Sequence, residues 1–74
     1  MELNKKQART LVLARFQNGV KVTGAWYSRD TKWITVYYFD PLTRDRINVR
    51  SSEFKIIVDR RTGRMSQPLK CSML

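Results

Sequence analysis

Apolar and polar residues alternate along much of the chain, and this period of two predicts a domain built from β-strands. Five segments follow the pattern, and short polar stretches separate them. We place the strands at residues 10–16, 20–28, 33–39, 46–50 and 54–58. The segment 33–39 (WITVYYF) is β-branched or aromatic at every position, so it is expected in the middle of the sheet or beneath a neighbouring subunit.

Turn-forming residues mark the ends of these segments. Asn18-Gly19 tolerates the positive φ of a tight hairpin turn, and Gly24 predicts a sharp bend or a close backbone approach within the second strand. Further turns are expected at residues 29–30, 40–41 and 51–52. Together these features predict an all-β fold, a small five-stranded and strongly bent antiparallel barrel preceded by a short helix. Sm-like, SH3-like and OB barrels all have this architecture.

The first residues contain a signal for the start of a helix. Asn4 and Gln7 have the spacing of a capping box, in which each side chain accepts a hydrogen bond from the other residue's backbone N–H. Continued to Phe16, such a helix would carry apolar residues almost all round its circumference, whereas a surface helix carries one apolar stripe. We therefore expect the helix to end near Arg9 and the first strand to start at Thr10.

These elements divide the chain into a helical arm at residues 1–9, a barrel at 10–58 and a basic tail at 59–74. The tail sequence DRRTG at 59–63 is a candidate for one more hairpin, and Pro68 and the ragged end predict partial disorder. The alternation assigns most of the core to ten side chains: Val12, Val22, Trp26, Ile34, Val36, Ile47, Val49, Phe54, Ile56 and Val58.

The charge balance points to a polyanionic partner. Fifteen Lys and Arg residues against six Asp and Glu residues give a formal net charge of +9. Such a field attracts nucleic acid, an anionic membrane surface or an acidic protein. The alternative is a solvated, self-repelling surface with no particular partner.

Several other classes of function are disfavoured by composition. Cys71 is the only cysteine and the chain has no His, so an internal disulfide and a Cys/His zinc site are excluded. The six carboxylates are scattered and no Gly-rich phosphate loop is present, so we expect neither an enzyme nor a bound metal or cofactor. No secretory signal and no apolar run of the ~18 residues that span a membrane is visible. We therefore expect a cytoplasmic protein without membrane contact.

Two stretches resemble the sequence motifs of the Sm-like family of RNA-binding proteins (LSm and Hfq type). ARFQNGVKVTGAW is similar to the first Sm motif, and Asp30 follows Gly24 at the spacing of the family's loop aspartate. VRSSEFKII is similar to the second motif, with Arg50 at its arginine. Lys32 and Ile34 replace the family's stacking and uracil-reading residues, and Ser51 and Glu53 replace the Gly and Asn of the second motif; the Tyr-Lys-His of the Hfq type is also absent. The resemblance therefore implies an RNA-binding barrel with weak base preference.

The resemblance also implies a homo-oligomeric ring of five to seven subunits. A 74-residue domain buries only about 60% of the surface that its unfolded chain exposes, and self-association would supplement this thin core. We expect the predicted fourth strand of one subunit to pair with the fifth strand of the next.

The candidate binding residues follow from the loops and exposed strand positions. Lys32 and Arg50 correspond to the loops that hold RNA in the family, and Arg29 lies beside Lys32. Tyr27 is expected to share an exposed face with Lys21, whereas most other aromatic residues are expected in the core or in subunit contacts.

The resulting hypothesis is a non-catalytic ring that binds single-stranded RNA mainly through its backbone. DNA is a further candidate ligand. The alternatives are an SH3-like or Tudor-like module that docks on an acidic partner, such as a phage-type inhibitor, and a DNA-binding structural protein.

Overall fold

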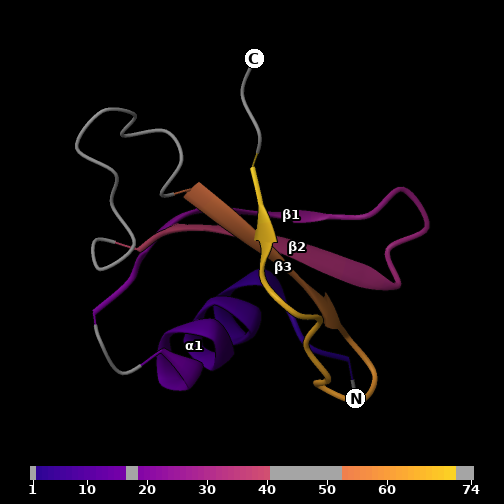
Figure 1. The fold of residues 1–74 in the computed structure, drawn as a ribbon. Helices are drawn as coiled ribbons and strands as arrows, with labels where there is room; N and C mark the ends of the chain where they lie inside the picture. The colour runs from indigo at the N-terminus through magenta and orange to yellow at the C-terminus, as the bar shows by residue number, and fades with distance from the viewer. Residues whose placement is uncertain (1, 17–18, 41–52, 72–74) are drawn as a thin grey trace.

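Within the part of the chain that the structure describes, one helix and a four-stranded antiparallel sheet make up the fold (Figure 1). The structure is a computed structural model that describes residues 2–16, 19–40 and 53–71. The elements are α1 (Lys5–Arg15), β1 (Lys21–Tyr27), β2 (Trp33–Phe39), β3 (Glu53–Asp59) and β4 (Leu69–Lys70). The strands lie in the order β1-β2-β3-β4, and α1 packs on one side of the sheet. None of the helices in these ranges is long and apolar enough to cross a membrane.

The helix begins as predicted and ends later than predicted. The Asn4 side chain accepts a hydrogen bond from the Gln7 backbone N–H, and the Gln7 side chain accepts one from the Asn4 N–H, each at 2.9 Å. The strand expected at residues 10–16 is wrong, because α1 continues to Arg15. Ala8 and Val12 are one turn apart and fully buried, so this face of the helix supplies core contacts. The predicted helix end near Arg9 was wrong because one of the apolar residues on the circumference, Leu13, lies outside the core and is 46% exposed.

The central strands confirm the alternation seen in the sequence. β2 pairs along its length with β1 on one side and β3 on the other, so the predicted central position of segment 33–39 is correct. Its buried residues are Ile34, Val36 and Tyr38, and Tyr38 stacks between the rings of Phe16 and Phe54 with centroid distances of 5.0 and 5.7 Å. Burial raises the pKa of the Tyr38 hydroxyl. The strand predicted at 46–50 lies outside the described residues.

A β-bulge in β1 changes which side chains enter the core. The pairing with β2 shifts between Val22 and Gly24, at the position where the sequence predicted a bend. Because side chains alternate with a period of two, the extra residue moves the rest of the strand to the opposite faces. Ala25 is therefore buried, and Trp26, which was expected in the core, is 60% exposed.

Of the other predicted core residues, those in the described ranges are buried or partly buried. Val12, Ile34, Val36, Ile56 and Val58 are buried, and Val22 and Phe54 pack against them in partly buried positions. The buried residues missing from the prediction are Ala8, Val20, Ala25 and Tyr38. Ile47 and Val49 lie outside the described residues.

The chain after β3 forms the hairpin that DRRTG predicted. The Asp59 side chain accepts hydrogen bonds from the backbone N–H groups of Arg61 and Thr62, and Gly63 takes a positive φ of 77°. Met65 then bridges to Val58, and β4 pairs with the start of β3. Within the described residues the sheet is open, with β1 and β4 at its edges, so these strands do not close into the expected barrel.

We expect the helix cap to contribute measurably to stability. Asn4→Ala should lower the free energy of unfolding by about 1 kcal/mol, because the Gln7 N–H loses its acceptor. Urea unfolding measures the change. Asn4→Ser keeps a side-chain acceptor and serves as the control. Equal stability of the Ala variant and the parent chain would contradict this role for the capping box.

Candidate nucleic-acid interface

The side of the sheet away from α1, here called the open face, carries large apolar side chains. The described strands present it in rows that cross the sheet, because paired residues on neighbouring strands point to the same side. The rows are Trp33–Asp59, Trp26–Thr35–Ile57, Gly24–Tyr37–Lys55–Leu69 and Lys21–Phe39–Glu53. The ribbon of α1 lies on the opposite side of the sheet (Figure 1), and from α1 the Lys5 side chain reaches the Trp26 ring. Exposed aromatic rings on an uncovered sheet are a surface on which bases can stack.

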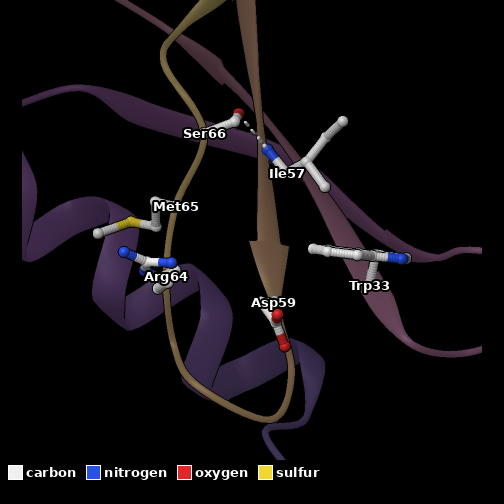
Figure 2. A pocket seen from close by; sticks show the side chains of 6 residues that line it. All are labelled: Trp33, Ile57, Asp59, Arg64, Met65 and Ser66. Carbon is white, nitrogen blue, oxygen red and sulfur yellow. Dashed lines mark hydrogen bonds between the residues drawn. The ribbon is translucent and has the colours of Figure 1, made fainter.

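Trp33 lies at one end of the open face, beside two hollows. It is 43% exposed and lies directly opposite Asp59 in the β2–β3 ladder. A hollow of about 450 Å³ lies beside it, between β2, β3 and the returning chain (Figure 2). Its lining consists of Trp33, Ile57, Asp59, Arg64, Met65 and Ser66. The hollow therefore combines an aromatic ring, a carboxylate and a guanidinium group.

A second hollow adjoins Trp33 and has a different chemistry. It has a volume of about 380 Å³ and is lined by Ser28, Trp33, Thr35 and Ile57. The Ser28 hydroxyl is already engaged, because it donates to Asp30 at 2.7 Å and accepts from the Trp33 backbone N–H at 3.1 Å. This second hollow is thus mainly apolar.

Trp26 extends the aromatic surface towards the edge of the sheet. Its indole lies next to Gly24, where an added Cβ would come within 3.2 Å of the ring nitrogen. Glycine at this bulge therefore allows the ring to lie close to the strand. The Lys5 ammonium lies 5.1 Å from the ring centroid, within the range of a cation–π contact.

The β1–β2 turn is organised around Asp30. Its carboxylate accepts from the Ser28 hydroxyl and from the Lys32 backbone N–H, and these hydrogen bonds lower the pKa of Asp30. Thr31 adopts a φ of 59° within the turn. The turn leaves Arg29 and Lys32 exposed at the end of the sheet where Trp33 begins β2.

Tyr27 and Arg60 form a structural junction at the same end of the sheet. The Arg60 guanidinium lies 4.7 Å from the Tyr27 ring centroid and donates to the backbone carbonyls of Leu3 and Thr31. Lys5 lies 5.3 Å from the same ring. Arg60 thus joins the N-terminal segment to the β1–β2 turn, and two cations already contact the Tyr27 ring.

The structure brings together three of the five predicted binding residues. Tyr27, Arg29 and Lys32 lie at or beside the β1–β2 turn, whereas Lys21 lies on the open face at the opposite end of β1, paired with Phe39. Because of the bulge, Tyr27 does not share a face with Lys21. Arg50 lies outside the described residues.

Sequence reasoning did not single out Trp33 as a binding residue. The signal was present in segment 33–39, which is apolar on both of its faces. Once α1 covers Ile34, Val36 and Tyr38, the other face must meet solvent or a ligand. Arg64 was placed only in the basic tail at residues 59–74, since nothing in the sequence indicated that the chain returns past Trp33.

Comparison with known proteins gives no relative: no family model, curated protein or solved structure matches the chain. The described residues also contain no group of three or more side chains suited to hold a metal ion. The open face and the charges around it are therefore the features of the described residues that bear on function.

The contribution of Asp30 to the stability of the fold should depend on pH. A carboxyl whose pKa is lower in the folded than in the unfolded chain stabilises the fold at pH values above its ordinary pKa, which is 3.8 for Asp30. This stabilisation is lost as the pH falls through the lower pKa of the folded state. Asp30→Ala should therefore unfold at lower urea concentration than the parent at pH 7, and the difference should shrink below pH 3.8. A difference that stays constant down to pH 2 would contradict this role.

Proposed function

We propose that this chain is a non-catalytic module that binds single-stranded RNA on the open face of its sheet. Bases stack on Trp33 and Trp26, and basic side chains contact the phosphates. The observation that carries the proposal is an uncovered sheet face with two exposed tryptophans in a chain of net charge +9. In water such apolar area favours a partner, and the charge favours an anionic one.

The basic residues lie where a bound strand would need them. Arg29 and Lys32 lie beside the Trp33 end of the open face, and Arg64 lines the hollow next to Trp33. Lys55 and Lys21 occupy the rows beyond Trp26. An RNA strand whose bases follow the rows from Trp33 towards Tyr37 would thus have basic side chains near both ends of its sugar-phosphate backbone.

The five-stranded Sm-like barrel and its ring remain separate proposals. The ring that the resemblance implies needs strand 46–50 of one subunit to pair with segment 54–58 of the next. In the described residues this segment belongs to β3, which pairs with β2 on one edge and with β4 and Met65 on the other. A ring built on β3 would have to displace these contacts, so RNA binding is proposed here for the single subunit, in the cytoplasm and with weak base preference overall.

Replacing Trp33 should weaken RNA binding more than any other aromatic change. We expect Trp33→Ala to cost about 1–3 kcal/mol of affinity for a short single-stranded RNA, because one stacking platform is removed. Trp33→Phe should restore part of the loss. Leu13→Ala removes an exposed apolar side chain from the helix and is the matched control. Fluorescence anisotropy measures the affinities, and equal losses for Trp33→Ala and Leu13→Ala would overturn the proposed site.

The binding should also fall steeply with added salt. Each phosphate that a basic side chain neutralises contributes about −0.7 to the slope of log affinity against log salt for a single strand. A titration from low to physiological salt with RNA and with duplex DNA measures the slope and the preference for single strands. Flat binding, or none at low salt, would contradict the proposal and favour an acidic protein as partner.

A further inference from the structure

Trp33 lines two hollows whose other lining residues differ in charge and polarity. Ile57 and Trp33 line both, but only one of them contains charged groups, namely Asp59 and Arg64. The Ser66 hydroxyl in that hollow is already used, because it accepts from the Ile57 backbone N–H at 3.0 Å and donates to the Gln67 carbonyl. The groups left to recognise a base there are therefore the carboxylate and the guanidinium.

Backbone hydrogen bonds hold the Asp59 carboxylate in place, and no described cationic side chain forms an ion pair with it. Its Oδ1 accepts from the backbone N–H of Arg61 at 2.8 Å and from that of Thr62 at 3.4 Å. Neither Asp59 nor Arg64 forms an ion pair with another described residue. The turn therefore presents a fixed, charged acceptor directly opposite an exposed indole.

We propose that this hollow is a subsite selective for guanine, a specificity that rests on the proposed RNA-binding function. A base stacked on Trp33 would place an edge against Asp59. Guanine presents two adjacent donors there, N1–H and the 2-amino group. They match the Asp59 Oδ2 atom and the remaining capacity of Oδ1, whose contact with the Thr62 N–H is long at 3.4 Å. Uracil has one donor flanked by carbonyl acceptors, and adenine and cytosine place an acceptor beside their amino group. Hydrogen bonds between a carboxylate and such donors are strong, and an unmatched acceptor is repelled.

Arg64 and the second hollow complete the subsite. A carboxylate repels phosphate, and the Arg64 guanidinium on the same hollow opposes that repulsion for the guanine nucleotide. The hollow lined by Ser28 and Thr35 has no charged group, so a neighbouring base on the other side of Trp33 is bound by stacking alone. Selectivity is therefore expected at one nucleotide position and absent at the next.

The test compares short uridine oligonucleotides that contain one guanosine, one inosine or neither. The parent chain should bind the guanosine oligonucleotide about 5- to 150-fold more tightly than oligouridine, the range expected for a matched bidentate contact. Inosine lacks the 2-amino group and should lose much of this preference. Asp59→Asn should abolish the preference while keeping an Oδ1 acceptor for the turn, and thermal unfolding verifies that the fold is intact.

A matched variant separates specificity from charge. Glu53→Gln removes the carboxylate at the other end of β3 on the same face, with the same change in net charge, and should leave the guanosine preference unchanged. The inference is overturned if Asp59→Asn and the parent share one ratio of guanosine to uridine affinity, or if inosine and guanosine bind alike. If the parent binds none of the oligonucleotides, the proposed function itself fails, an outcome that the affinity ratios distinguish from a loss of specificity alone.

Discussion

The burial of one helical face against one face of the sheet is the contact on which the fold depends. An isolated helix of 11 residues is marginal in water, so α1 needs tertiary contacts to persist. Ala8 and Val12 supply them by packing, fully buried, on Ile34, Val36 and their neighbours. A single helix covers only one side of a sheet. The same contact that completes the core therefore leaves the aromatic side of β2 available for a ligand.

The bulge in β1 distributes side chains between these two faces. Without the extra residue, Trp26 would point towards the helix and Ala25 away from it. With it, the small side chain enters the core and the indole joins the open face, where Gly24 leaves room for the ring. A bulge and a lysine are also features that discourage edge-to-edge pairing, and β1 has both, with Lys21 as its first residue. The edge is thus better suited to remain free than to join another sheet.

Features that depend on local chemistry were predicted more reliably than features that depend on packing between distant segments. Segment 33–39, the capping box at Asn4 and the hairpin at 59–63 depend on local chemistry, and all three are confirmed. The extent of α1 and the position of Trp26 depend on packing between distant segments, and both predictions were wrong. A period-2 count cannot locate a bulge residue by residue. Nor could it place Arg64 and Trp33 in the lining of one hollow, because that hollow is created only when the chain returns along β3.

The distribution of charge on the open face determines how a polyanion can lie there. Glu53 and Asp59 occupy the two ends of β3, with Lys55 between them, so β3 itself is a poor track for a line of phosphates. Arg29 and Lys32 instead lie beside the β1–β2 turn, and Lys21 lies on the edge strand. An RNA strand that directs its phosphates towards these residues must turn its bases inward, over Trp26 and Trp33. In the proposed complex the Asp59 carboxylate then meets a base edge, where hydrogen-bond donors are found, and the cations meet the backbone, so each of these charges faces the part of the nucleotide that it attracts.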